Sequence, residues 1–154
     1  MACLHAKPKD DYPLLWGPGL ISTSLPEVAA TFGVGSPERE ALSRALNWWA
    51  TGVRETGVSV KAWICGSYLT SKPSPHDIDL IVWPANRVYI GTDAERANAM
   101  FDRKHVYMNY GIDIHIEGLS NAEAFEKEAY YLGFYGFGWD RRTPRTIAEI
   151  VVNP

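Results

Sequence analysis

Three acidic residues occur in segments that are otherwise apolar. Asp77 and Asp79 lie two apart in Asp-Ile-Asp-Leu-Ile-Val-Trp, and Asp113 lies in Gly-Ile-Asp-Ile-His-Ile. Side chains two apart on a strand leave the same face, roughly 7 Å apart, and a neighbouring strand can bring Asp113 alongside. Three carboxylates buried together without a counter-charge are costly, so this cluster is typical of a site for divalent cations. Oxygen ligands alone favour Mg²⁺ or Mn²⁺.

A Gly-Ser pair, Gly66 and Ser67, directly follows an apolar run that ends at Cys65. Glycine lets the backbone approach a ligand closely, and a serine hydroxyl with neighbouring N–H groups can hold phosphate oxygens. Lys72, in the loop that follows, offers a further contact to phosphate. We therefore expect Gly66, Ser67 and Lys72 to bind phosphate beside the carboxylates.

This ordered set resembles the nucleotidyltransferase superfamily of the DNA polymerase beta type. Its pattern is an apolar strand ending in Gly-Ser, then Asp-apolar-Asp, then an Asp on a later strand, and the matching segments here are 64–67, 77–80 and 111–114. Segments 12–19, 25–29, 66–73 and 134–145 are also similar to a group of small bacterial and phage nucleotidyltransferase-like proteins. Tyr68-Leu69-Thr70 departs from the superfamily, which usually has Arg-Gly after the serine.

The resemblance implies a role for each of these residues. Asp77 and Asp79 would hold two Mg²⁺ (or Mn²⁺) ions that bridge the triphosphate of an NTP. Asp113 would share one ion and help to deprotonate the attacking hydroxyl. Two ions about 4 Å apart stabilise both the attacking and the leaving oxygen of an in-line displacement. Pyrophosphate would be left on the Gly66–Ser67 loop.

The function implied is a metal-dependent enzyme that moves a nucleoside monophosphate from an NTP to a hydroxyl. The acceptor would be an RNA 3′ end, a protein side chain or a small molecule, and a toxin, defence or counter-defence role follows only by analogy. An alternative is a catalytically weak module that binds a nucleotide or a protein on the same fold. A third is a two-metal nuclease, which also uses clustered carboxylates but does not need the Gly-Ser element.

Other residues near these motifs have two interpretations each. His115, two residues after Asp113, could touch substrate or could be a polar residue on a half-exposed strand. The aromatic residues of 130–139, with Arg141, Arg142 and Arg145, could stack on a base and bind phosphate. The same aromatic residues could instead pack on the sheet.

The elements that position these residues follow from the hydrophobic periodicity and from capping residues. Alternation predicts strands at 58–65, 77–83, 111–117 and, at a sheet edge, 146–152. Helical spacing and caps predict helices at 24–33, 36–57, 92–103 and 120–133. We expect an α/β (α+β) fold with one mixed, twisted sheet of about four to five strands and flanking helices, in a single domain 1–154. Residues 1–23, rich in Pro and Gly, are predicted to form an irregular arm docked on it.

Composition is that of an ordinary globular chain, with 154 residues of which 46% are hydrophobic and 21% charged. A formal net charge of −3 argues against an overall basic coat for nucleic acid, but a local basic patch is compatible with it. Cys3 and Cys65 form no disulfide framework and no zinc set. Because no signal-peptide core and no apolar stretch of about 20 residues occurs, we expect no membrane partner and a cytoplasmic location.

Overall fold

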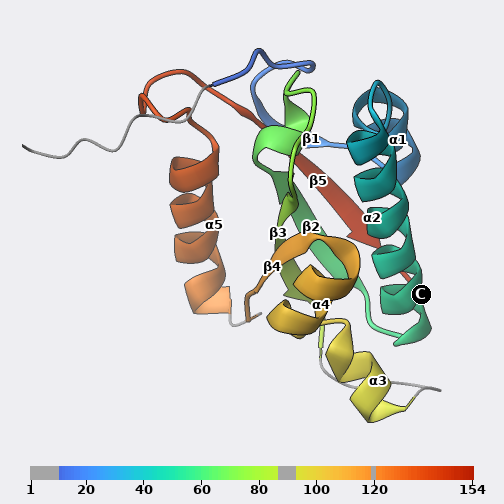
Figure 1. Cartoon of the computed structure of the whole chain (residues 1–154). Helices are drawn as coiled ribbons and strands as arrows, with labels where there is room; N and C mark the ends of the chain where they lie inside the picture. Colours follow the sequence, from blue (N-terminus) through green and yellow to red (C-terminus); the bar gives the residue numbers. More distant parts are fainter. Residues whose placement is uncertain (1–10, 87–92, 119–120) are drawn as a thin grey trace, which may run out of the picture.

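The computed structural model describes residues 11–86, 93–118 and 121–154 (Figure 1). They form one mixed five-stranded sheet in the order β1-β5-β2-β3-β4, flanked by helices, so the expected fold class is confirmed. The strands are β1 Gly19–Ser22, β2 Val60–Cys65, β3 Ile78–Pro84, β4 Ile112–Ile116 and β5 Thr146–Val152. The helices are α1 Leu25–Phe32, α2 Pro37–Glu55, α3 Ala94–Ala99, α4 Arg103–Tyr110 and α5 Asn121–Tyr135, with a 3₁₀ turn η1 at Ser67–Leu69.

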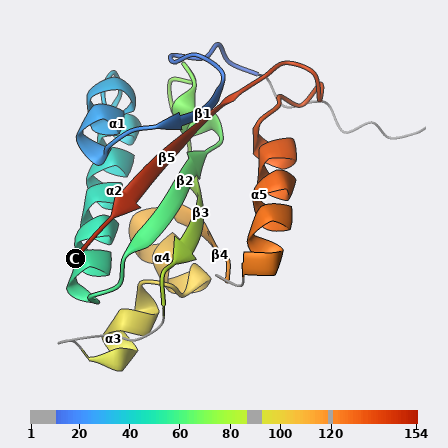
Figure 2. The ribbon, with the colours of Figure 1, turned by 180° about the vertical axis from the view of Figure 1, so that it is seen from behind.

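The sheet separates two helical layers, which Figures 1 and 2 show from opposite sides. Helices α1, α2 and α4 cover one face, where Val60, Ala62 and Ile64 of β2 join the larger hydrophobic core. Helix α5 covers the other face, where Trp63 and Cys65 join a smaller cluster. The alternation of β2 in the sequence therefore predicts its two faces correctly. Within the described ranges, no helix combines the length and apolarity that crossing a bilayer requires.

Strand directions bring several chain segments to one end of the sheet. Strand β2 runs antiparallel to β3 and β5, whereas β3 and β4 are parallel, as are β1 and β5. The end of β2 therefore lies beside the starts of the other strands, at the top of Figure 1. The loop 66–77, the arm 11–18 and residues 136–145 meet at this end.

Strand assignments need two corrections. Part of the expected irregular arm is a strand, because β1 pairs in parallel with β5 from Gly19↔Thr146 to Ser22↔Glu149. Consequently β5 lies inside the sheet, between β1 and β2, and is not the edge strand expected from the sequence. Most of β1 is exposed, so no buried alternation marks it in the sequence.

Helix assignments also need corrections. The helix expected over 92–103 is shorter and begins after Asp93, which caps α3. A separate helix, α4, follows it, where the side chain of Asp102 accepts a hydrogen bond from the His105 N–H. Val106 is the buried residue of α4, so its periodicity is weak. Helix α5 continues past Gly133 to Tyr135, and Thr92 and Ser120, with which two of the expected helices begin, lie outside the described residues.

Candidate active site

Two of the predicted carboxylates lie side by side on neighbouring strands. Asp79 of β3 and Asp113 of β4 are register partners, so their side chains leave the same face of the sheet. Asp77 immediately precedes β3 and is half-buried, like the other two. The intervening Ile78 and Ile112 point to the opposite face and belong to the larger core. The apolar residues thus fix the face on which the carboxylates lie.

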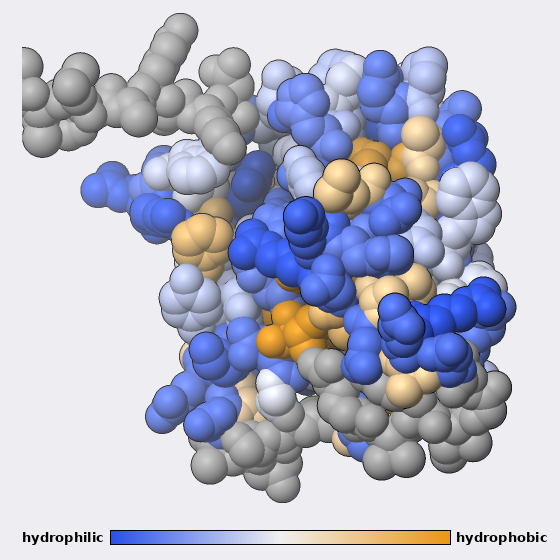
Figure 3. Space-filling model, turned by 60° about the horizontal axis from the view of Figure 1, so that its bottom comes forward, coloured by the Kyte–Doolittle hydropathy of each residue, from blue (hydrophilic) through white to orange (hydrophobic). Residues whose placement is uncertain are grey.

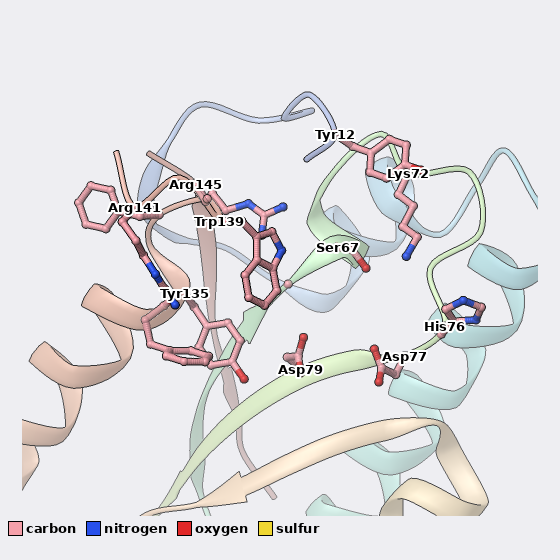
Figure 4. Close-up of a pocket in the computed structure, with 14 residues that line it drawn as sticks. Tyr12, Ser67, Lys72, His76, Asp77, Asp79, Tyr135, Trp139, Arg141 and Arg145 are labelled. Carbon is pink, nitrogen blue, oxygen red and sulfur yellow. Dashed lines mark hydrogen bonds between the residues drawn. The ribbon is translucent and has the colours of Figure 1, made fainter. Parts of the chain in front are cut away.

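A cavity of about 400 Å³ opens on two of these carboxylates, Asp77 and Asp79. It is lined by Asp77, Asp79, Gly66, Ser67 and Lys72, all of them predicted from the sequence as site residues. In Figure 4 the Ser67 hydroxyl and the Lys72 ammonium group face the space above the carboxylates of Asp77 and Asp79. The cavity therefore places a hydroxyl and an ammonium group opposite two carboxylates.

Asp113 does not line this cavity and is paired with Arg103 of α4. The guanidinium donates from Nε to Oδ1 at 2.7 Å and from Nη2 to Oδ2 at 3.0 Å, a bidentate pair that raises the pKa of Arg103. Among the described residues, no group of three His, Cys, Asp or Glu side chains is arranged to hold a metal ion. The structure thus brings Asp77 and Asp79 to one cavity and gives Asp113 an arginine as its counter-charge.

The backbone conformation at position 66 requires glycine, independently of any ligand. Its φ of 82° and ψ of −162° lie in a region that only glycine adopts without strain. A Cβ atom at this position would overlap an oxygen of the Asp79 carboxylate. Glycine therefore lets the chain turn out of β2 while Asp79 lies directly against its backbone.

Arg39 of α2 organises the loop that carries Ser67 and Lys72. Its side chain is buried, with 4% exposed, and it donates to backbone carbonyl oxygens of Phe32, Tyr68, Thr70 and Lys72. Burial lowers the pKa of this guanidinium. The sequence does not reveal this role, because an arginine in a helix with a charged surface is normally solvated; only the proximity of the loop identifies it.

Aromatic and basic side chains form the opposite wall of the cavity. Tyr135, Trp139, Arg141 and Arg145 form this wall, whereas Tyr12 of the arm lines the cavity beside Lys72 (Figure 4). Burial, and secondarily the charge of Asp79, raise the pKa of Tyr135.

A hydrogen bond and an ion pair connect the aromatic and basic wall of the cavity to the arm. Asp11 accepts a hydrogen bond from the Trp139 N–H at 3.1 Å and pairs with Arg145 at 3.2 Å. On the other side of the cavity, the Ser71 N–H donates to the Pro13 carbonyl at 2.8 Å. The arm is thus hydrogen-bonded to the rest of the chain at residues 11 and 13, and residues 1–10 lie outside the described residues.

Of the aromatic residues in 130–139, some pack on the sheet and others face the cavity. Tyr131 packs on the sheet with its ring at 6.2 Å from that of Trp83, whereas Trp139 faces the cavity. His115 lies on the same sheet face as Asp113 but packs beside Tyr131, with ring centroids 6.2 Å apart. Cys65 is buried, and burial raises the pKa of its thiol well above the ordinary value.

A comparison with protein-family models matches residues 8–151 to DUF6932, described as a family of unknown function. No curated protein and no solved structure matches the chain. Because the family match extends over nearly the whole length, the chain belongs to the DUF6932 family.

Proposed function

We propose that the protein is a metal-dependent nucleotidyltransferase, which moves a nucleoside monophosphate from an NTP to a hydroxyl acceptor. The observation that carries the proposal is the register of Asp79 with Asp113, at the sheet end where Asp77, Gly66 and Ser67 also lie. Clustered carboxylates beside a phosphate-binding loop provide what phosphoryl transfer needs, namely positioning and electrostatic stabilisation.

The residue types fit a divalent cation. Asp77, Asp79 and Asp113 would hold Mg²⁺ or Mn²⁺, because carboxylate oxygens are the ligands these ions prefer. Bound there, the ions would neutralise phosphate charge and stabilise the leaving oxygen. Asp113 already has a cationic partner in Arg103, and a divalent cation would take the place of that partner.

The chain's own residues would position the reactants. Ser67 and Lys72 would hold the phosphates, with Arg145 facing them from the opposite wall. Trp139 offers a ring on which the base of the nucleotide can stack. Asp113 would accept the proton of the attacking hydroxyl once Arg103 has moved from it.

One observation favours the alternative, a nucleotide-binding module without turnover. In the described part of the chain, the three carboxylates are not gathered as a metal-holding group, and Arg103 engages both oxygens of Asp113. If Arg103 keeps this position when a nucleotide is bound, the third carboxylate takes no part in the reaction. Tight NTP binding without pyrophosphate release would support this alternative.

The experiment measures binding and transfer separately. Calorimetry with Mg²⁺ or Mn²⁺ and each NTP gives affinity, and incubation with α-labelled NTP, RNA and cell protein gives the acceptor. We expect Asp79→Asn to weaken metal-dependent NTP binding and to lower transfer by orders of magnitude.

The matched control is Glu126→Gln, which removes an exposed carboxylate from α5 and should leave both measurements unchanged. Absence of divalent-cation binding in the presence of every NTP would contradict the proposal. Equal transfer by the wild type and Asp79→Asn would contradict it as well.

A further inference from the structure

A second cavity, of about 440 Å³, lies next to the first and shares Asp77 with it. Its other lining residues are Asp113, Arg103, Lys104 and Tyr107, of which the last three belong to α4. The first cavity holds the phosphate-binding groups, whereas the second holds the carboxylate proposed to activate the acceptor. The two cavities adjoin at Asp77, so two bound molecules could meet there.

Two cations, Arg103 and Lys104, line the second cavity opposite its two carboxylates, and Arg103 is paired with Asp113. Arg103 and Lys104 are consecutive in the first turn of α4, and this turn contains no acidic residue. The helix dipole disfavours cations at a helix N-terminus, and at α4 the carboxylate of the capping Asp102 offsets this effect.

An exposed aromatic ring accompanies these cations. Tyr107 lies four residues after Arg103, on the same side of α4, and its side chain is 50% exposed. Figure 3, in which the lower side of Figure 1 comes forward, shows mostly hydrophilic side chains, with hydrophobic ones in smaller areas. Cations beside an exposed aromatic ring are the combination that binds a single nucleic-acid strand, by phosphate contacts and base stacking.

We infer that the second cavity binds the 3′ end of a single-stranded nucleic acid, whose terminal hydroxyl is the acceptor. This inference rests on the proposed function, and it selects one acceptor class for it. A protein side chain would bring a neutral hydroxyl and would leave Lys104 without an anion. RNA and DNA share the phosphates and bases that the cavity would contact, so both are compared in the test.

Binding of the acceptor strand would break the ion pair of Arg103 with Asp113. A phosphate of the strand competes with Asp113 for the guanidinium, whose planar fork suits either anion. Arg103 would thus leave Asp113 when the acceptor arrives. The carboxylate then becomes available to the hydroxyl only in the presence of the strand.

The proposed transfer forms one bond to phosphorus and breaks another. The 3′ oxygen forms a bond to the α-phosphorus of the NTP, and the bond from that phosphorus to the bridging oxygen of the β-phosphate breaks. Pyrophosphate leaves with the electron pair of that bond. The proton of the hydroxyl passes to Asp113 and then to water. The strand is one nucleotide longer, and no oxidant or reductant takes part.

The test uses the full chain and fluorescent single-stranded oligonucleotides of RNA and of DNA, with a free or a blocked 3′ hydroxyl. Anisotropy gives affinity at several salt concentrations, and α-labelled NTP gives transfer. We expect Lys104→Gln to weaken strand binding about tenfold and to lower the salt slope by about one unit. Its affinity for NTP should equal that of the wild type. Blocked strands should bind normally and take up no label.

Arg44→Gln is the matched control, because Arg44 is an exposed cation on α2, outside both cavities. Equal loss of strand affinity in Arg44→Gln and Lys104→Gln would overturn the inference, since general attraction would then explain binding. If label enters protein while strands with a free 3′ hydroxyl stay unlabelled, the inference is overturned. The proposed function would still hold. Lys104-dependent strand binding without pyrophosphate release from any NTP would support the strand site and overturn the proposed function.

Discussion

Gly66 illustrates at the scale of one residue how the backbone and the site depend on each other. Its positive φ is strained for any residue with a Cβ, and the adjoining Asp79 oxygen would also have to move. We expect Gly66→Ala to lower the free energy of unfolding by roughly 1–3 kcal/mol. Urea unfolding followed by circular dichroism measures this change. Because the Asp79 carboxylate would be displaced, metal-dependent NTP binding should weaken in the same variant.

Gly133→Ala provides the comparison for this prediction. Gly133 lies inside α5 with no atom near the position of an added Cβ. Alanine should therefore stabilise the helix, by about 1 kcal/mol at most. If Gly66→Ala proves as stable as the wild type, the strain assigned to Gly66 is absent.

The sequence indicates acidic and glycine residues of the candidate site better than arginines. Asp79 is recognisable because a carboxylate in an apolar strand is unusual, and Gly66 because Gly-Ser follows one strand shortly before the Asp-Ile-Asp of the next. Arg39 and Arg103 look ordinary, since arginine occurs on most helix surfaces. Their roles come from contacts with residues that are distant in the sequence, as in the case of Arg39 with Tyr68.

At the scale of elements, α2 determines the conformation of the loop after β2 through Arg39. Replacement by Met would leave the carbonyl oxygens of Phe32, Tyr68 and Lys72 without their buried donors. Each unsatisfied buried acceptor costs about 1–3 kcal/mol, so Arg39→Met should lower the free energy of unfolding by about 3 kcal/mol or more. Chemical denaturation measures it.

Arg44→Met on the same helix is the matched variant, because its side chain is exposed. We expect it to change the free energy of unfolding by no more than about 0.5 kcal/mol. Arg39→Lys should recover little of the loss, since an ammonium group lacks the planar fork of guanidinium. Similar stability of Arg39→Met and Arg44→Met would show that the loop does not depend on this side chain.

Elements with strong periodicity or clear caps are predictable from the sequence, and the others are not. Helix α2 has a capping serine and a continuous apolar stripe, and β4 alternates strictly between isoleucine and polar residues. Strand β1 and helix α4 have mostly exposed residues, and tertiary pairing decides their structure. The order of the strands is also not predictable from the sequence, because β5 becomes internal only when β1 pairs with it.

On the scale of the whole molecule, the two layers beside the sheet are unequal. Helix α2 buries Leu42, Leu46, Trp49 and Val53 in the larger core. In the part of α5 whose side chains are described, Tyr131 is the buried hydrophobic residue, with Tyr135 partly buried beside it. An ion pair joins Glu128 to Lys61 of β2 and adds a contact at the surface. Helix α5 therefore has less buried apolar area holding it to the sheet.

This inequality predicts that α5 opens locally before the rest of the fold. Elements with few buried apolar contacts exchange their amide hydrogens through partial openings, at a lower free energy than global unfolding. We expect the amides of α5 to exchange at least about tenfold faster than those in the middle of α2, a difference of about 1.4 kcal/mol. Hydrogen exchange followed by mass spectrometry of peptides measures both helices together.

Two variants of α5 test the cause of this difference. Tyr131→Ala removes the buried ring and should accelerate exchange in α5 more than in α2, whereas Tyr130→Ala, at an exposed ring, should change little. Equal protection of α5 and α2 in the wild type would contradict the prediction.

Because α5 carries Tyr135 at the cavity and leads into the segment with Trp139, its opening would widen the space above Asp79. Bound nucleotide, by contacting that wall, should therefore slow exchange in the C-terminal half of α5 and leave α2 unchanged.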